Sequence, residues 1–141
     1  MYLLDTNVVS EMGKAAAGKV HPNVSAWART VFTSNLFLSI VTVMELEIGV
    51  LLMERRDTIQ GSRLRGWLKG QILPSFSGRI LNIDAQIARR YAALHVPNPT
   101  PYRDGFIAAT ALVYGMTVVT RNVVDFLPTG VTVLNPWEAT L

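Results

Sequence analysis

Acidic side chains beside apolar segments are the residues in this sequence best suited to chemistry. Asp5 ends an apolar segment near the N-terminus, and Asp125 follows another near the C-terminus. Glu45 interrupts the apolar stripe of a predicted helix, and Asp104 stands at the start of a later one. If these carboxylates met, they would repel one another unless divalent cations neutralised them. The pattern therefore predicts an all-oxygen Mg²⁺ or Mn²⁺ site, which most often serves phosphate chemistry.

Each of these acids also has an ordinary structural explanation. Asp5 could cap the helix that follows it, and Asp104 could stabilise the first turn of its helix by ~0.3–1 kcal/mol. Asn122 could cap a short helix together with Asp125 three residues later. Glu45 could form a structural ion pair with an arginine. Its place within an apolar stripe nevertheless favours a functional role, because a buried carboxylate without a partner is costly.

The elements that must position these acids are short apolar segments alternating with helical patterns. The predicted strands are Tyr2–Leu4, Leu36–Ser39, Arg79–Ile83, Thr117–Thr120 and Val131–Leu134. The predicted helices are Asn7–Met12, Asn23–Phe32, Val41–Arg56, Thr58–Leu73, Ala85–His95 and Arg103–Tyr114. Gly13–Gly18 is predicted as a flexible loop. This order favours an α/β fold with a mostly parallel sheet covered on both faces, whose strands end at one ligand-binding edge.

Composition limits the remaining possibilities. The 141 residues fit one domain spanning 1–141. The chain has no cysteine and only two histidines, which excludes disulfides, thiol catalysis and metal sites rich in Cys or His. We expect a cytoplasmic protein with no membrane association, because neither a signal peptide nor a long apolar run is present. Only 16% of residues are charged, against a usual share of roughly 25%, so a partner or second copy is expected to cover apolar surface.

Several blocks of sequence together carry a family resemblance. They are Leu3–Ser10, Leu38–Leu46, Asp104–Ala111, Thr117–Asn122 and Asn135–Trp137. In this order and spacing they resemble PIN-domain ribonucleases of the VapC toxin type. Ile72–Phe76 and the segment after it are similar to the subgroup of the fast-intracellular-trafficking toxin. The resemblance implies a three-layer α/β/α fold, Mg²⁺- or Mn²⁺-dependent endoribonuclease activity and a cognate VapB-like antitoxin.

The resemblance also implies roles for individual residues. Asp5, Glu45 and Asp104 match metal-binding acids of the family. Some relatives carry a fourth acid where Asn122 stands and others a few residues later, so we assign the fourth position to Asp125. Supporting hydroxyl and amide groups are expected from Thr6, Asn7, Ser39, Thr120 and Asn122, although each could equally be an ordinary cap or turn residue.

The expected mechanism is hydrolysis of an RNA phosphodiester by in-line attack of water. Asp5 and Asp104 would hold the principal ion, with Glu45 and Asp125 completing the acidic pocket. No side chain is well placed as a general base, and the lowered pKa of water on the ion could replace one.

Basic residues are the candidates for RNA contact. They are Arg55, Arg56, Arg63, Arg65, Arg103 and Arg121. The first four could instead form a solvated helix face, and the last two could brace carboxylates. Trp67 could stack on a base but is better explained as core or interface.

The apolar surface of Asn23–Phe32 and Val41–Arg56 could bind an amphipathic antitoxin helix, and we expect a homodimer that can form a larger assembly with the antitoxin.

Other folds and activities fit less well. Phosphatases of the haloacid dehalogenase type need a second acid where Asn7 stands and a catalytic lysine, and no lysine follows Lys69. Receiver domains need paired N-terminal acids and a late lysine. The serious alternative is an inactive PIN scaffold that binds nucleic acid or protein without cutting, and the amide of Asn122 keeps it open. A Mn²⁺ titration would separate the two hypotheses, because a scaffold has no reason to bind the ion.

Overall fold

A parallel sheet forms the centre of the structure, a computed structural model that describes residues 1–139. Its strands are β1 Tyr2–Leu4, β2 Leu36–Ser39, β3 Ile80–Leu81, β4 Thr117–Val119 and β5 Val133–Leu134, in the order β3-β2-β1-β4-β5. Every neighbouring pair is parallel, with Leu3 of β1 opposite Phe37 of β2 and Val118 of β4. The strands therefore end at one edge, as the sequence predicts, and the sheet is wholly rather than mostly parallel.

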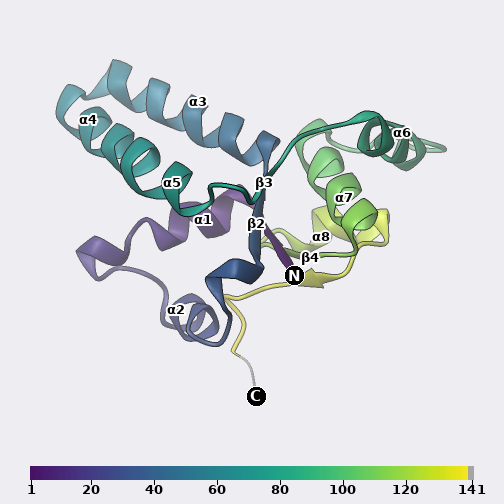
Figure 1. Cartoon of the computed structure of the whole chain (residues 1–141), viewed down its shortest axis with the longest axis horizontal. Coiled ribbons are helices and arrows are strands. Elements are labelled where there is room, and N and C mark those ends of the chain that lie inside the picture. Colours follow the sequence, from purple (N-terminus) through teal and green to yellow (C-terminus); the bar gives the residue numbers. More distant parts are fainter. Residues whose placement is uncertain (140–141) are drawn as a thin grey trace.

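Helices cover both faces of this sheet and confirm the three-layer α/β/α architecture. One layer holds α1 Thr6–Met12, α2 Pro22–Ala28, α3 Ile40–Arg56, α4 Thr58–Trp67 and α5 Leu73–Ser75. The other holds α6 Ala85–Leu94, α7 Tyr102–Tyr114 and α8 Val123–Phe126 (Figure 1). Short connecting helices are η1 Ala15–Ala17, η2 Thr33–Asn35, the π-helical η3 Leu68–Ile72 and η4 Leu127–Thr129.

The core consists of two apolar clusters, one on each face of the sheet. Leu4 and Val119 belong to the cluster beneath α1–α5, whereas Leu3 and Val118 belong to the cluster beneath α7 and α8. All four are fully buried. Successive side chains of a strand point to opposite faces, so central strands buried on both sides read as continuous apolar runs. This explains why the short runs in the sequence identify the strands.

Polar side chains fix where three of the longer helices, α3, α4 and α6, begin. The Ser39 hydroxyl accepts a hydrogen bond from the Val41 amide at the start of α3 (3.0 Å). Asp57 caps α4, and Asp84 caps α6 by accepting from the Ile87 amide (2.9 Å). Capping satisfies amides that lack a partner within the helix, so α3 begins directly at the end of β2.

Several predicted boundaries are wrong for local reasons. The helix predicted to Phe32 ends at Ala28, where the chain turns and the Thr30 hydroxyl donates to the Trp27 carbonyl (2.6 Å). The helix predicted over Thr58–Leu73 is interrupted by the π-helical segment η3 before Pro74, which lacks an amide donor. The predicted loop Gly13–Gly18 contains the helical turn η1, and α8 is too short to produce a periodic signal. Within residues 1–139, no helix is long and apolar enough to cross a membrane.

Candidate functional site

The C-terminal edge of the sheet brings polar side chains from four segments together around Asp5. Asp5 directly follows β1, is 5% exposed and caps α1 by accepting a hydrogen bond from the Thr6 amide (2.8 Å). The Thr120 hydroxyl, at the end of the adjacent β4, donates to the other Asp5 carboxylate oxygen (2.7 Å). The capping explanation is therefore correct for Asp5, but it uses only one of the two carboxylate oxygens.

Asn7 and Thr120 tie the ends of β1 and β4 to each other. The Asn7 amide lies 3.4 Å from both an Asp5 oxygen and the Thr120 hydroxyl. The Thr120 hydroxyl in turn accepts from the Asn122 backbone amide (3.0 Å). Asn122 therefore does not cap α8 with its side chain, contrary to the capping hypothesis, because the hydroxyl of Thr120 organises this turn. Ser39 contacts the start of α3 and none of these groups.

Glu45 extends from α3 between two donors of different chemistry. The Thr6 hydroxyl donates to one of its oxygens (2.9 Å), and the Arg103 guanidinium lies 3.4 Å from the other. The predicted structural ion pair is thus present, although the Arg103 side chain is 54% exposed and the pair is weakly held. Since Thr6 adjoins Asp5, the same contacts bring Glu45 to the edge of the sheet.

Electrostatic coupling shows that the acids share one region. Burial, and to a smaller extent the charges of Asp5, Asp125 and Glu45, together raise the pKa of Asp104, in the first turn of α7, to about 6. Burial also raises the pKa of Asp5, even though hydrogen bonds from Thr120 and Thr6 lower it. Asp125, on α8, is exposed and adds to both effects. The structure therefore brings together carboxylates that are far apart in the sequence.

The donors fit a hard divalent cation in chemistry but are not arranged around one. Within residues 1–139, no three Asp, Glu or His side chains are positioned to hold a metal ion. The oxygens of Asp5 and Glu45 accept from protein donors instead. A divalent cation would remove the repulsion that raises the pKa of Asp104, and carboxylate oxygens are the ligands that Mg²⁺ and Mn²⁺ prefer. Binding would therefore require some of these side chains to turn toward the ion.

An aromatic stack packs against the turn that carries Asp104, and no prediction from the sequence included it. The rings of Tyr91 on α6 and Phe106 on α7 stack with centroids 3.9 Å apart and an interplanar angle of 8°. A Cβ atom at Gly105 would lie 2.8 Å from the Tyr91 ring. The first turn of α7 can thus approach α6 only because the residue after Asp104 is glycine. The sequence signal for this close contact is the Asp-Gly-aromatic run that begins at Asp104.

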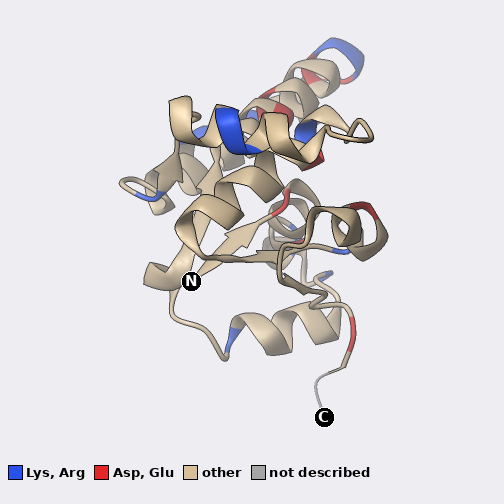
Figure 2. Ribbon diagram, turned by 90° about the vertical axis from the view of Figure 1, so that its right-hand side faces the viewer, with Lys and Arg blue, Asp and Glu red and all other residues tan. Residues whose placement is uncertain are grey.

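The predicted RNA-binding arginines lie in different environments. Arg65 pairs with Glu47 (2.6 Å) and Glu54 (2.9 Å), so it connects α4 to α3. Arg103 contacts Glu45, and Arg121 follows β4 beside the acids. The exposed arginines of the α3–α4 hairpin are Arg55, Arg56 and Arg63. Basic segments are spread over separate parts of the ribbon, so net charge alone does not identify a nucleic-acid surface (Figure 2).

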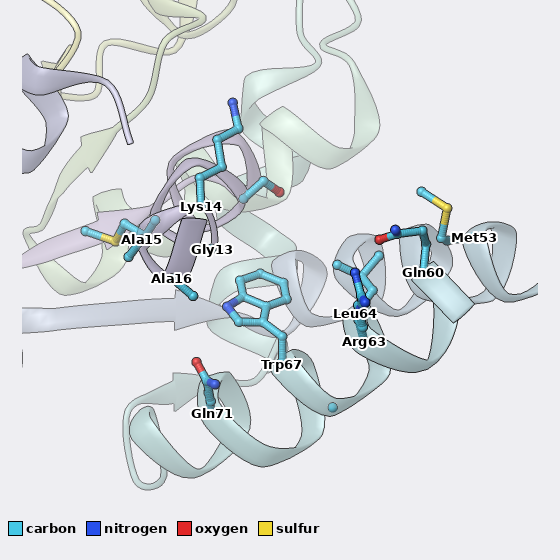
Figure 3. Close-up of a pocket in the computed structure, with 13 residues that line it drawn as sticks. Gly13, Lys14, Ala15, Ala16, Met53, Gln60, Arg63, Leu64, Trp67 and Gln71 are labelled. Atoms are coloured by element: carbon cyan, nitrogen blue, oxygen red, sulfur yellow. The ribbon is translucent and has the colours of Figure 1, made fainter. Parts of the chain in front are cut away.

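Trp67 packs against the segment after α1 rather than facing the acids. Its indole lies so close to Gly13 that a Cβ there would be 2.8 Å from the ring. It lines a cavity of about 580 Å³ between α4 and this segment, and the Lys14 side chain extends away from it (Figure 3). The core or interface explanation of Trp67 is therefore the one that its contacts favour.

Comparison of the sequence with known families identifies the PIN domain, whose profile matches residues 2–124. The chain is 39% identical to a VapC ribonuclease, Y4jK, of Sinorhizobium fredii, over 98% of this chain and 99% of the relative. It is 37% identical to Toxin FitB of Neisseria gonorrhoeae, again over 98% of this chain and 99% of the relative.

Solved structures give the same result at the level of the fold. A chain of FitAB bound to an IR36 DNA fragment superposes with a TM-score of 0.88 at 35% identity, covering 100% of this chain and 99% of that chain. A chain of FitAcB from Neisseria gonorrhoeae superposes with a TM-score of 0.87 at 36% identity, covering 98% of this chain and 99% of that chain.

Proposed function

Because this chain belongs to the PIN-domain family, in the branch that contains a VapC ribonuclease and Toxin FitB, we propose that it is a divalent-metal-dependent endoribonuclease and the toxin of a toxin–antitoxin module. The observation that carries the activity is the position of Asp104 in the first turn of α7, where burial and repulsion from Asp5, Asp125 and Glu45 together raise its pKa to about 6. Such repulsion between acids is typical of sites that perform chemistry rather than of sites that stabilise a fold.

The proposed roles rest on the family resemblance, and the contacts of Asp5 and Glu45 support them. Asp5 and Asp104 hold the principal ion, while Glu45 and Asp125 complete the pocket. A divalent cation in this pocket supplies charge neutralisation and activation of water for attack on a phosphodiester. Thr120 and the Thr6 amide fix the orientation of the Asp5 carboxylate, and the Thr6 hydroxyl orients Glu45. Arg103, beside Glu45, is placed to contact substrate phosphate once the acid binds the ion.

The partner we propose is a cognate antitoxin. The two solved relatives described above are FitAB and FitAcB complexes, and both match nearly the full length of this chain. Large apolar side chains remain uncovered in one layer, namely Phe32 (78% exposed) in the connection after α2, Leu51 (54%) on α3 and Ile59 (67%) on α4. Burying such a surface against an amphipathic helix is favourable, which supports the proposal that the antitoxin binds this layer.

The activity is tested by incubating the purified chain, freed of antitoxin, with total RNA and Mn²⁺ or Mg²⁺. We expect discrete cleavage that disappears with EDTA and in Asp104→Asn. Asp84→Asn is the matched control, because asparagine replaces aspartate equally well at the start of α6. Cleavage that persists in Asp104→Asn would refute the assignment of this residue, and cleavage that persists in EDTA would refute metal dependence.

One observation favours the alternative of an inactive scaffold. Among the described residues, the acids are not arranged to hold a metal ion. Mn²⁺ binding, measured by calorimetry on the wild type and Asp104→Asn, separates the two proposals. A nuclease binds the ion and loses affinity in the variant, whereas a scaffold binds it in neither.

A further inference from the structure

A second hollow lies beside the acidic site and is bordered mostly by basic and aromatic side chains. It has a volume of about 580 Å³ and lies between the segment after α1, the start of α2 and the turn after β4. Its chemically distinctive lining residues are Glu11, Lys14, Lys19, His21, Arg121 and Trp137. We call it the basic groove. None of the acids assigned to the metal site lines it.

The only carboxylate in this lining is already neutralised. Glu11 accepts hydrogen bonds from the Lys14 ammonium (2.9 Å) and the His21 backbone amide (2.9 Å), and these bonds lower the pKa of its carboxyl. Lys19 and Arg121 form no ion pair with any carboxylate in the described part of the chain. The basic groove therefore carries positive charge that no carboxylate of the described residues neutralises. Arg65 differs, because two glutamates neutralise its charge.

Arg121 connects the basic groove to the acids. Its backbone amide donates to the Asn7 side-chain oxygen (3.3 Å), and the Asn7 amide contacts Asp5 (3.4 Å). Arg121 also lines a hollow on its other side, together with Asn122 and Asp125. Through Arg121 the basic groove thus borders the hollow that contains Asp125, one of the acids of the proposed metal site.

An aromatic surface completes the groove. The Arg121 guanidinium carbon lies 5.3 Å from the centre of the Trp137 ring, within the range of a cation–π contact. The Trp137 segment is fixed by a hydrogen bond from Asn23 on α2 to the Trp137 carbonyl (2.7 Å). Cations without a carboxylate partner beside a fixed, half-buried indole are typical of surfaces that bind single-stranded nucleic acid, because cations attract phosphates and exposed aromatic surface stacks on bases.

We propose that the basic groove, through Lys19, Arg121 and Trp137, binds the single-stranded RNA that flanks the cleaved bond. The inference rests on the proposed nuclease function and assigns the strand a path over one layer of the protein. An acidic protein segment fits less well, since it would meet the carboxylates where the groove ends. An RNA strand instead has one phosphate at the metal site and its neighbours over the cations. The arginines Arg55 and Arg56, at the far end of α3, are then not part of this path.

The test compares three double variants that each remove two positive charges. They are Lys19→Gln/Arg121→Gln in the groove, Arg55→Gln/Arg56→Gln at the end of α3, and Arg89→Gln/Arg90→Gln on α6 in the opposite layer. Binding of a fluorescein-labelled single-stranded oligouridylate is followed by anisotropy over a range of salt concentrations, in EDTA, with the probe checked for integrity. Thermal unfolding confirms that each variant is folded, and Lys19→Gln alone, at an exposed position, replaces the groove double variant if that variant does not fold.

We expect the groove variant to bind the probe about tenfold more weakly and to lower the slope of log K against log salt by ~1.4, or ~0.7 for each lost phosphate contact. The two other variants should bind like the wild type. Equal affinity of the groove variant and the wild type, or an affinity loss confined to Arg55→Gln/Arg56→Gln, would overturn the inference. The inference would also be overturned if an acidic peptide competed with the probe for the wild type and its binding were lost only in the groove variant. Cleavage of RNA is scored separately, so that a nuclease with a different strand path is distinguished from a chain that does not cut RNA.

Discussion

Replacing Asp104 by asparagine should make the metal-free protein more stable above about pH 6, even though it removes the proposed activity. The pKa of Asp104 is about 6 in the folded chain, against about 3.9 for an unfolded aspartate. The folded chain therefore binds this proton more tightly. The stabilisation from protonated Asp104 is present below about pH 4 and is lost as the pH rises through about 6.

The size of the effect follows from the shift and from the exposure of the side chain. A shift of about two units corresponds to ~3 kcal/mol at ~1.4 kcal/mol for each unit. Asp104 is only partly buried, so solvent screens much of this interaction and ~1 kcal/mol is a realistic expectation. The loss of a favourable contact between the carboxylate and the first turn of α7 acts in the opposite direction by a few tenths of a kcal/mol.

The assay is urea unfolding of wild type and Asp104→Asn in EDTA, near pH 4 and near pH 7.5. The difference in unfolding free energy between the two proteins should grow by ~1 kcal/mol in favour of the variant between these pH values. Asp84→Asn serves as the control and should show no comparable growth. A variant whose relative stability does not change with pH would mean that neither burial nor the neighbouring carboxylates raise the pKa of Asp104 in the folded chain. If the reasoning is correct, adding Mn²⁺ should raise the unfolding free energy of the wild type and leave that of Asp104→Asn unchanged.

Three further changes test the surroundings of the acids. Gly105→Ala places a Cβ 2.8 Å from the Tyr91 ring, so the urea midpoint should fall by an amount that corresponds to ~1–3 kcal/mol, and Mn²⁺ affinity should fall with it. Thr120→Val removes the hydroxyl that donates to Asp5; stability should fall by ~1.5–3 kcal/mol, and the cleavage rate should fall as well. Arg65→Met breaks the contacts between α3 and α4; it should lower the melting temperature slightly and leave RNA affinity unchanged.

Matched variants keep these tests specific. Gly66→Ala, at a position where an added Cβ meets nothing within 4 Å, should stabilise α4 by up to ~1 kcal/mol. Thr120→Ser retains the hydroxyl and should retain most of the cleavage activity. If Gly105→Ala were as stable as the wild type, the stack of Tyr91 and Phe106 would not constrain the first turn of α7. Weaker RNA binding by Arg65→Met would mean that, in the wild type, Arg65 leaves Glu47 and Glu54 to contact the substrate.

The site owes its assembly to β1 and β4, which lie side by side although more than one hundred residues separate them. The Thr120 hydroxyl bonds to Asp5 across this pair, and the register aligns Leu4 with Val119, the residues that precede them. A parallel pair needs a long crossover, and here the crossover carries the helices that bear Glu45 and Asp104. The pairing of β1 with β4, together with that of β1 with β2, therefore brings three of the acids to the same edge.

The sequence by itself determined the strands, most of the longer helices and a mostly parallel arrangement of the sheet, which the structure shows to be wholly parallel. These features depend on local patterns, namely short apolar runs such as Tyr2–Leu4 and helical stripes such as Val41–Arg56. It also indicated which acids stand at the edge of the sheet, because the end of a parallel strand is visible as the end of its apolar run.

Only the tertiary structure decided how side chains from distant segments are paired. The sequence left open whether Glu45 is functional or structural, and the fold gives it both Thr6 and Arg103 as neighbours. It presented Arg65 as a free cation, whereas helix packing places two glutamates around it. Periodicity records which face of an element is buried but not what lies opposite that face. Hydrogen bonds, ion pairs and pKa shifts depend on distances of a few ångströms between segments far apart in the chain, and these distances exist only once the layers have packed.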